Sequence, residues 1–420
     1  MTFAKISIIG LGYIGLPTAA ILASKEMNVV GVDINSKIVD TINCGAIHIV
    51  EPDLEDIVKT VVKKGYLRAS IIPEPADVFL IAVPTPFNFN ETSADLSYIE
   101  AATRTISDVI KPGNLVILES TSPVGTTEQV AKWLSGLRPD LTFPQSHGDS
   151  SDIHLAYCPE RVLPGNAVQE LQENDRVIGG LTEKCSSLAK MFYETFVRGR
   201  CFITNARTAE MAKLTENSFR DVNIAFANEL SMICDEWNIS VWELIGLANH
   251  HPRVNILEPG PGVGGHCIAV DPWFIISKAP DKSHLMRMAR AVNDSKPEWV
   301  GELIINAITK YLFENNNKAL SDVTVSVYGL AFKPDVDDLR ESPSIAIIKK
   351  LGENYPGIIQ IVEPHITELP GSLRQENFKL VEFSDAVNAN IHVLLVKHSR
   401  FSNLKSTLSA DAVLVNIKGD

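Results

Sequence analysis

The sequence predicts an α/β protein in which two Rossmann-like, doubly wound domains are joined by a central helical domain with a long helix. Strand-like and helix-like segments alternate from "KISIIGLG" onward, a helical block follows, and the alternation restarts after the asparagine-rich segment 313–322. Such alternation is typical of parallel sheets with right-handed crossovers. We therefore expect domains at residues 1–203, 204–312 and 313–420, in keeping with a chain of 420 residues.

The strands of the first domain are predicted from short apolar runs. "KISIIGLG", "NVVGVDI", "DVFLIAVPTP" and "NLVILESTSP" have the length of buried strands, and "IGLPTAAILAS" has a helical pattern. Lys5 and the apolar run 6–23 also resemble a signal peptide. The glycines and Pro17 that interrupt this run, and the strand that follows it, favour a nucleotide-binding fold.

The third domain has the same alternation of strand-like and helix-like segments. "DVTVSVYGLAF", "IIQIVEP", "HVLLVKH" and "AVLVNIKG" are strand-like, and "SPSIAIIKKLGENY" is helix-like. Between the two α/β domains, an apolar stripe of a long helix is predicted at residues spaced three or four apart, namely Phe219, Val222, Phe226, Leu230, Ile233 and Trp237. This stripe could pack against a second subunit or equally well within one chain.

Charge and cysteine usage exclude several classes of function. The net charge of −13 argues against nucleic acid or an anionic membrane as a partner, because both attract broad basic surfaces. No stretch is long and apolar enough to cross a bilayer. The six cysteines are scattered, with no CxxC pair and no zinc-ligand spacing, so we expect no metal site. A disulfide framework is not expected in a chain of this size, which indicates a reducing cytoplasm.

A glycine motif at the end of the first strand predicts a dinucleotide site. "GLGYIG" places Gly10, Gly12 and Gly15 between a strand and a helix, with Tyr13 and Ile14 inside the motif. The glycines permit a tight turn, close approach of a pyrophosphate and close helix packing, while the helix N-terminus attracts the anion. Asp33 ends the second strand, where a carboxylate accepts both ribose hydroxyls and repels a 2′-phosphate. The expected cofactor is therefore NAD.

Two threonines at the same predicted sheet edge are candidate cofactor contacts. Thr85 lies in "AVPTP" and Thr126 in "STSPVGTTE", each following a strand. Ligands of such folds bind at this edge. Threonines in ordinary turns or helix caps would look the same in the sequence.

A polar stripe on the long helix is a candidate for the chemistry. Lys213, Asn217 and Arg220 have the spacing i, i+4 and i+7, so they share one helix face. An amine with an amide one turn away can hold an alcohol and its developing oxyanion. A solvated face is the alternative, and the stripe supports chemistry only where it faces a reactive group.

The segment "GPGVGGHCIAVDP" places Cys267 in a loop too rich in glycine for regular structure. A free cysteine is commonly a small buried apolar residue, but the glycines let the backbone approach a ligand closely. His266 and Asp271 add groups that can handle protons. A nucleophilic thiol needs cationic or dipolar help to ionise, which Lys213 or a helix N-terminus could supply.

An NAD fold together with an activated thiol predicts oxidation of an aldehyde through a thioester. The thiol converts the aldehyde into a thiohemiacetal, and only then does the carbon carry a hydrogen that can leave as hydride. The glycines of the loop would clear space for the substrate carbon to reach the sulfur.

At these motifs the chain resembles the UDP-glucose/GDP-mannose dehydrogenase family. "GLGYIG", "VPTP", "STSPVG", "CPERVLPG", "EMAKLTENSFRDVNIAFANEL", "GPGVGGHCIAVDP" and "GLAFKPDVDDLRESPS" occur in the family's order along nearly the whole chain. "HIVEPDL" and "NHHPRVNILEPGPGVGGHC" resemble the bacterial branch that acts on UDP-N-acetyl-D-mannosamine. The resemblance implies two successive NAD reductions that convert the C6 alcohol of a UDP-sugar into a carboxylate.

The resemblance also implies roles for individual residues. Cys267 would be the nucleophile, Lys213 with Asn217 would hold the oxyanion, Asp271 would position a water, and Thr121 and Glu160 would serve the water-dependent steps. Substrate contacts would come from Arg161, Val162, Arg220, His251, Arg253, Gly264, Phe332, Lys333 and Lys418. Arg340 would contact the cofactor. The central domain would form a homodimer in which Arg253 reaches the neighbouring site.

Three alternatives remain at this stage. A UDP-N-acetylglucosamine or UDP-glucose 6-dehydrogenase differs only in the sugar. A two-electron β-hydroxyacid dehydrogenase would share the first domain and the Lys213/Asn217 helix, but would leave the thiol loop and the third domain without a role. A non-catalytic NAD-sensing protein on the same fold is the third, because a fold alone does not imply an activity.

Overall fold

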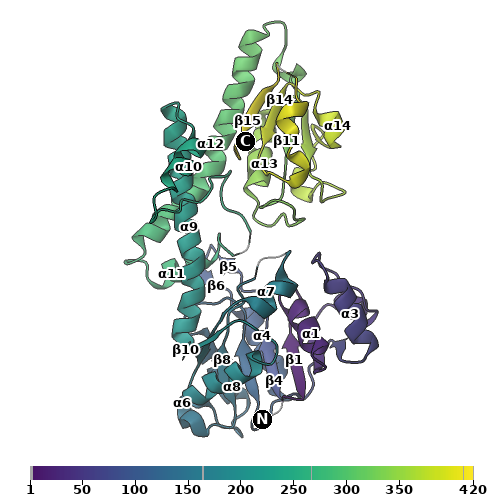
Figure 1. Cartoon of the computed structure of the whole chain (residues 1–420), viewed down its shortest axis with the longest axis vertical. Coiled ribbons are helices and arrows are strands. Elements are labelled where there is room, and N and C mark those ends of the chain that lie inside the picture. The colour runs from purple at the N-terminus through teal and green to yellow at the C-terminus, as the bar shows by residue number, and fades with distance from the viewer. Residues whose placement is uncertain (1–2, 163–164, 266, 410, 420) are drawn as a thin grey trace. The chain divides into compact units, whose positions relative to one another are not determined.

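The computed structural model describes residues 3–162, 165–265, 267–409 and 411–419. The chain divides into two compact units, one formed by residues 1–216 and 273–278 and the other by residues 217–272 and 279–420 (Figure 1). Each unit is built around its own mainly or wholly parallel sheet.

The first unit contains an eight-stranded sheet in the order β10-β9-β8-β7-β4-β1-β2-β3. Its neighbouring strands are parallel except for the antiparallel pair β8 and β9. The strands are β1 (Lys5–Ile9), β2 (Asn28–Val32), β3 (Leu67–Ser70), β4 (Val78–Ile81), β7 (Leu115–Leu118), β8 (His154–Tyr157), β9 (Arg176–Gly180) and β10 (Cys201–Asn205). A separate hairpin joins β5 (Phe87–Asn88) to β6 (Ser93–Ala94).

Helices cover both faces of this sheet, which explains why its central strands are apolar throughout. On one face, α1 (Gly15–Ser24), α3 (Leu54–Lys63) and α8 (Glu183–Tyr193) contribute to one core. On the other face, α4 (Ser97–Ser107) and α5 (Thr126–Leu137) contribute to a second core. The remaining helices are α2 (Ser36–Asn43), α6 (Pro144–His147), η1 (Gly148–Ser150) and α7 (Ala167–Glu173).

The second unit contains a five-stranded, wholly parallel sheet in the order β13-β12-β11-β14-β15. The strands are β11 (Val325–Tyr328), β12 (Ile359–Val362), β13 (Phe378–Leu380), β14 (Ile391–Leu394) and β15 (Val413–Asn416). The end of α12 (His284–Glu314) and α13 (Pro343–Asn354) share one core with the sheet, while α14 (Phe383–Ala386) and α15 (Leu404–Thr407) share the other. Short 3-10 turns are η2 (Leu320–Asp322), η3 (Gly371–Leu373) and η4 (Ser399–Phe401).

The long helix predicted for the central block is α9 (Ala206–Glu236), and it is followed by α10 (Val241–Ala248) and α11 (Asp271–Lys278). Within the second unit, α9 meets α12 through polar contacts. Arg290 Nη1 lies 2.7 Å from Asp221 Oδ1, and Lys296 Nζ donates to Ser231 Oγ over 2.6 Å. Burial lowers the pKa of Lys296 to about 7.

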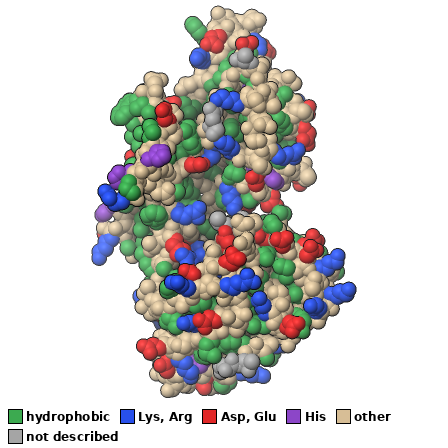
Figure 2. All heavy atoms as spheres, viewed as in Figure 1, with side chains coloured by type: hydrophobic (Ala, Val, Ile, Leu, Met, Phe, Trp, Pro, Cys, Tyr) green, Lys and Arg blue, Asp and Glu red, His purple; other side chains and the backbone are tan. Residues whose placement is uncertain are grey.

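The apolar stripe of α9 does not form this contact. Phe219, Phe226 and Trp237 are 66%, 51% and 66% exposed, and apolar side chains are visible on the surface of the helical region in Figure 2. The side of α9 that is buried within the chain carries mostly polar or small residues instead, including Asn217, Ser218, Asp221, Ala225 and Asn228. Phe219, Phe226 and Trp237 are therefore available to a partner, while Val222, Leu230 and Ile233 are half-buried, and the sequence had left a subunit contact and intrachain packing as equal alternatives.

The fold class predicted from the sequence is confirmed: two parallel-sheet α/β domains flank helices that include the 31-residue α9. The run 6–23 forms most of β1, the glycine turn and nearly all of α1. The end of α12 contributes Val300, Ile304 and Ile308 to the core of the five-stranded sheet, so that core includes residues before 313. The three-domain boundaries remain a prediction. In the described part of the chain, no helix has the length and hydrophobicity of a membrane span.

Candidate active site

The glycine motif forms a tight turn at the end of β1. Gly10 has φ of 95°, and its N–H donates to the carbonyl of Val32 over 2.8 Å. A methyl group on Gly10 would lie 2.5 Å from the carbonyl oxygen of Ala82, and one on Gly15 would clash with the carbonyl of Gly10. A methyl group on Gly12 would meet no atom within 4 Å. Gly10 and Gly15 are thus required by the fold, whereas the space at Gly12 is left open, as an approaching pyrophosphate needs.

Asp33 clamps this turn from the end of β2. Its Oδ2 accepts a hydrogen bond from the N–H of Leu11 over 3.0 Å, and its Oδ1 accepts one from Asn35 over 2.9 Å. The next side chain, Ile34, is 93% exposed. The carboxylate therefore stands beside the open glycine turn, next to an apolar side chain that is free to cover a base.

The two candidate threonines differ. The buried Oγ1 of Thr85 has no hydrogen-bond partner among the described residues, as expected of a group that awaits a ligand. The hydroxyl of Thr126, only 2% exposed, donates to the carbonyl of Pro123 over 2.6 Å at the start of α5. The hydroxyl hydrogen of Thr126 is therefore already engaged within the protein. Tyr13 and Ile14 lie half-buried in the glycine turn, and Ile14 is the N-cap residue of α1. The open turn, Asp33 and Thr85 together fit NAD.

Two strand ends of the first unit are tied together near Thr121. Ser120 Oγ accepts from the N–H of Val83 over 3.0 Å and donates to its carbonyl over 2.7 Å. Thr121 follows directly and is half-buried. Because β4 and β7 are adjacent and parallel, this link fixes the segments after both strands at one sheet edge.

Glu160 is held in a buried ion pair that the sequence did not predict. Its Oε2 lies 2.7 Å from Nη1 of Arg176, and its Oε1 accepts from the N–H of Arg161 over 2.6 Å. Glu160 is 6% exposed and Arg176 1%. The ion pair with Arg176 fixes the orientation of the Glu160 carboxyl group.

A second carboxyl lies behind this pair. Glu119, at the end of β7, accepts a hydrogen bond from the hydroxyl of Tyr193 over 2.6 Å. Burial, and then the charge of Glu160, raise the pKa of Glu119 to about 7. Burial likewise raises the pKa of the neighbouring Cys158 thiol. One arginine thus faces two buried carboxyls, of which Glu160 is the one it contacts.

The remaining predicted site residues of the first unit lie next to this pair or on α9. Arg161 forms an ion pair with Glu216 of α9, with Nη2 2.9 Å from Oε1. Val162 packs against the first core. Lys213 is half-buried on α9, one helical turn before Asn217. Lys213 belongs to the first unit and Asn217 to the second.

In the second unit, the thiol lies in a turn that leads into α11. The carbonyl oxygen of Cys267 accepts hydrogen bonds from the N–H groups of Val270 (3.1 Å) and Asp271 (2.8 Å), and Cys267 is half-buried rather than sealed in a core. Asp271 is the first residue of the helix and is 3% exposed. The backbone of Cys267 therefore lies at the N-terminal end of α11. His266 lies outside the described residues.

Asn217 is joined to this turn. Its side-chain amide donates to Oδ2 of Asp271 over 2.5 Å, and both side chains are buried. The structure therefore brings together three of the predicted catalytic residues: Asn217 and Asp271 by side chains, and Cys267 by the backbone of the same turn.

The glycine segment before Cys267 is anchored by polar contacts within the second unit. The N–H of Gly260 donates to Asn228 Oδ1 (2.9 Å), Asn228 in turn donates to Asn293 (2.9 Å), and Asn293 donates to Asp221 (2.8 Å). Lys418 donates from Nζ to the carbonyl of Pro259 over 3.2 Å, and burial lowers its pKa. Lys418 is therefore part of this anchor.

The loop after β11 also packs on the glycine segment. A methyl group on Gly264 would lie 2.9 Å from Cβ of Phe332, and the N–H of Gly265 donates to the carbonyl of Arg340 over 3.1 Å. Lys333 Nζ lies 5.8 Å from the centroid of the Phe332 ring. Predicted substrate residues from the third domain thus meet the thiol segment. The Arg340 guanidinium pairs with Asp338, with Nη2 2.6 Å from Oδ2.

Three predicted substrate residues lie on the surface of the second unit. Arg220, His251 and Arg253 are exposed, and the N–H of Arg253 donates to Nδ1 of His251 over 3.3 Å. Sequence reasoning missed the buried partners Glu119, Arg176, Asn228 and Asn293. For Glu119 a signal was present, because "VILE" ends a strand with an acid just as "GVD" does.

Models of one protein family match almost the entire chain in three parts. The NAD binding domain of the UDP-glucose/GDP-mannose dehydrogenase family matches residues 4–197, the central domain residues 207–296, and the UDP binding domain residues 326–419. The chain belongs to this family. It is an NAD-dependent nucleotide-sugar dehydrogenase whose first domain binds NAD and whose last is a UDP binding domain.

Curated relatives are similar over the full length. The NDP-N-acetyl-D-galactosaminuronic acid dehydrogenase of Ralstonia nicotianae is 57% identical over 99% of this chain and 96% of its own length. The UDP-N-acetyl-D-mannosamine dehydrogenase of Yersinia pestis is 55% identical over 100% of this chain and 99% of its own.

Solved structures of this family have the same architecture. The UDP-D-ManNAc dehydrogenase of Pyrococcus horikoshii has a TM-score of 0.86 and 36% identity, covering 99% of both chains. The UDP-N-acetyl-mannosamine dehydrogenase of Staphylococcus aureus has a TM-score of 0.82 and 40% identity, covering 99% of this chain and 98% of its own. The two-electron β-hydroxyacid dehydrogenase considered from the sequence leaves the UDP binding domain unexplained.

Proposed function

We propose that this dehydrogenase oxidises the C6 alcohol of UDP-N-acetyl-D-mannosamine to the carboxylate, in two NAD-dependent steps through a thioester on Cys267. The observation that carries the chemistry is the junction of Asn217, Asp271 and Cys267 at the start of α11. The sugar follows from relatives and structures named for this substrate, at 55% and 36–40% identity.

In the first step Lys213 takes the proton of the C6 hydroxyl, and the amide of Asn217 donates to the developing oxyanion. NAD supplies the hydride acceptor when bound. The Cys267 thiolate then adds to the aldehyde carbon, giving a thiohemiacetal whose C–H can leave as the second hydride. The resulting thioester is hydrolysed by a water that Asp271 orients.

Glu160 supplies the base for this hydrolysis. Its ion pair with Arg176 fixes its orientation, and a carboxylate can take the proton of an attacking water. Thr121 holds the water in place. Overall, one alcohol and one water give one carboxylate, and two NAD molecules are reduced.

The remaining predicted roles belong to this proposal. The cofactor is held by Gly10, Gly12, Tyr13, Ile14, Gly15, Asp33, Thr85, Thr126 and Arg340. The UDP-sugar is held by Arg161, Val162, Arg220, His251, Arg253, Gly264, Phe332, Lys333 and Lys418. The protein acts as a cytoplasmic homodimer, in which the exposed stripe of Phe219, Phe226 and Trp237 forms part of the interface and Arg253 reaches the partner's site.

An N-acetylgalactosamine nucleotide is the second candidate substrate, because a relative at 57% identity is named for the galactosaminuronic acid product. The deciding experiment incubates the protein with NAD and each of UDP-N-acetylmannosamine, UDP-N-acetylglucosamine, UDP-N-acetylgalactosamine and UDP-glucose, and counts NADH per sugar consumed. We expect two NADH per UDP-N-acetylmannosamine and the highest kcat/KM for it. One NADH per sugar would refute the thioester route, and a higher kcat/KM for another sugar would refute the substrate.

A further inference from the structure

Two turns of the chain, one in each unit, have the same construction. After β1, Gly10 (φ 95°) donates to Val32 and the next N–H, that of Leu11, donates to Asp33. After β11, Gly329 (φ 94°) donates to the carbonyl of Val362 over 2.9 Å. The following N–H, that of Leu330, then donates to Glu363 over 2.7 Å. The acid after the second strand thus clamps the glycine turn after the first strand in both units.

In the second unit, the clamping acid has one further partner, a histidine. Glu363 Oε2 accepts from the N–H groups of Leu330 and Ala331 and also lies 3.1 Å from Nε2 of His398. Both side chains are fully buried. A carboxylate oxygen with three hydrogen-bond partners is closed to a ribose hydroxyl, so this oxygen of Glu363 makes contacts within the protein only.

The proton positions on His398 follow from its partners. Nδ1 accepts the backbone N–H of Asp335 over 3.0 Å, and a backbone N–H can only donate. Nε2 therefore carries the hydrogen and donates it to Glu363. His398 is the neutral Nε2–H tautomer with both ring nitrogens used.

These bonds grip both ends of one short loop. Glu363 holds Leu330 and Ala331, and His398 holds Asp335, so Phe332 and Lys333 lie between two fixed points. Asp335 has φ of 57°, a left-handed conformation that costs a non-glycine residue energy and persists only where its surroundings enforce it. Ser399 adds two donors to Asp335 Oδ1, from its N–H (2.9 Å) and hydroxyl (3.0 Å).

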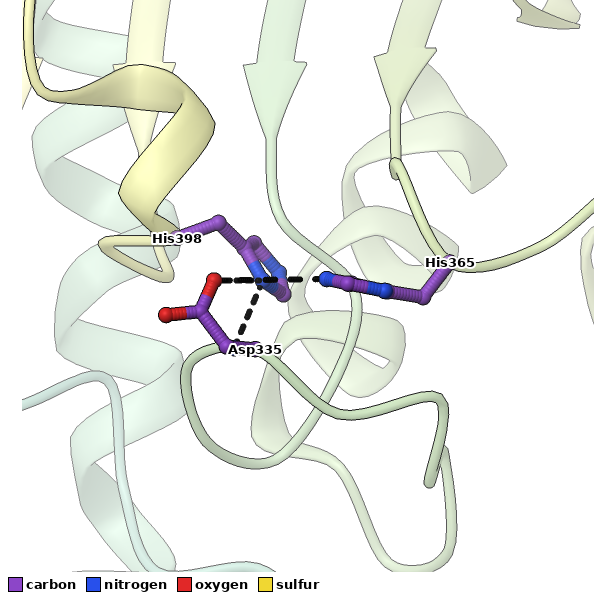
Figure 3. Close-up of side chains that lie close together, drawn as sticks. All are labelled: Asp335, His365 and His398. Atoms are coloured by element: carbon purple, nitrogen blue, oxygen red, sulfur yellow. Dashed lines mark hydrogen bonds and ion pairs between the residues drawn. The ribbon is translucent and has the colours of Figure 1, made fainter. Parts of the chain in front are cut away.

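The side chains of Asp335, His365 and His398 come close together, as Figure 3 shows, and they resemble a metal site. Asp335 Oδ1 lies 4.0 Å from His365 Nε2 and 3.8 Å from His398 Nδ1. However, a metal on His398 Nδ1 would displace the Asp335 N–H from it, and Ser399 already donates twice to Asp335 Oδ1. Hydrogen bonding accounts for the cluster without an ion.

We propose that His398 is a positioning residue for the UDP-sugar, because it fixes the 330–335 loop that presents Phe332 and Lys333. This rests on the proposed function only in that Phe332 and Lys333 contact the substrate. Phe332 also packs on Gly264 and Gly265, which precede the thiol by three and two residues, so the same hydrogen bonds set the distance between the held nucleotide and Cys267.

The test uses full-length protein with three replacements of His398. H398N retains an acceptor near the position of Nδ1, H398Q retains a donor near the position of Nε2, and H398F retains only the bulk. H392F is the matched control, since His392 is a fully buried histidine of β14 in the same unit, bonded to Tyr328 through Nδ1 over 3.0 Å and not to the loop. Calorimetry measures the Kd of UDP alone, and kinetics give KM and kcat.

We expect H398F to raise the Kd of UDP and the KM of the UDP-sugar at least about tenfold, with the KM of NAD within about twofold of wild type. H398N and H398Q should each recover part of the loss. H392F should leave the Kd of UDP within about twofold even where its melting temperature falls equally. EDTA should change nothing.

Four results would overturn the proposal: UDP affinity within about twofold of wild type in H398F, an equal loss of UDP affinity in H392F, a parallel rise in the KM of NAD, or a loss of UDP affinity on adding EDTA. If H398F does not fold, H398N and H398Q are judged by the same limits. UDP binding is measured without turnover. Failure to oxidise any UDP-sugar would therefore refute the proposed function without refuting the positioning role of His398.

Discussion

The side-chain amide of Asn217 and the carboxylate of Asp271 form a buried hydrogen bond at the point where the thiol turn becomes a helix. The N–H of Asp271 also donates to the carbonyl of Cys267. Asp271 thus links the long helix α9 to the backbone of Cys267, the proposed nucleophile, and the position of this turn depends on a side chain about 50 residues earlier in the chain.

A double-mutant cycle measures this link. N217A and D271A should each lower kcat, and their effects should combine with a coupling free energy of about 1–3 kcal/mol, because either single change already removes the shared hydrogen bond. The quantity measured is kcat in the wild type, both single variants and the double variant. Strictly additive effects would show that the two side chains act independently.

Replacing the proposed nucleophile should separate the two oxidations from the hydrolysis that follows them. In C267S an oxygen ester forms in place of the thioester and hydrolyses slowly, so the enzyme should accumulate a covalent sugar adduct. Intact-protein mass spectrometry after incubation with NAD and the UDP-sugar detects it. C44S, at an exposed cysteine remote in sequence from the loop, should turn over like wild type. Full activity of C267S without an adduct would contradict a covalent route.

Replacing two glycines of the same motif should have different effects, one on stability and one on NAD binding. G15A adds a methyl group that would overlap with the carbonyl of Gly10, so it should destabilise the fold by about 3 kcal/mol or more. G12A meets no atom, so it should melt like wild type yet bind NAD at least about tenfold more weakly. Thermal melting and NAD titration of both variants check this, and normal NAD binding by G12A would place the pyrophosphate elsewhere.

The buried carboxyl of Glu119 should make stability depend on pH. Its pKa is raised from 4.5 to about 7 in the folded protein, so the folded state binds more protons than the unfolded state between these values. The free energy of unfolding should therefore fall as pH rises from about 4.5 to 7, by up to about 3 kcal/mol.

E119Q supplies the matched measurement, since a neutral amide replaces the protonated carboxyl. Glu160, Arg176, Tyr193 and Cys158 surround Glu119 and remain in place. The variant should match wild type near pH 5 and exceed its stability near pH 8 in urea unfolding. The same difference in stability at both pH values would show that Glu119 does not titrate in this range.

The exposed stripe of α9 predicts a subunit interface. F226D places a charge on that stripe and should shift the proposed dimer to monomer in analytical ultracentrifugation, because burying an unpaired carboxylate is costly. F226L keeps the surface apolar and should remain dimeric. A dimeric F226D would locate the interface on another surface.

Strand runs and glycine turns were predictable because they depend on local sequence. "KISIIGLG" and "VTVSVYGLAF" each contain a strand and its glycine turn within ten residues, and the structure has the strands as β1 and β11. The partner of the α9 stripe could not be predicted, because periodicity shows that a face is apolar and not what covers it. Asn217 with Asp271, and Glu160 with Arg176, pair residues far apart in sequence, so only a folded chain reveals them.

The duplicated clamp has a consequence for inhibitor design. An adenosine mimic built to reach the carboxylate of Asp33 meets, in the second copy, an equivalent acid that an imidazole already occupies. At this position His398 distinguishes the second unit from the first, because its imidazole contacts the acid that a ribose mimic would otherwise reach.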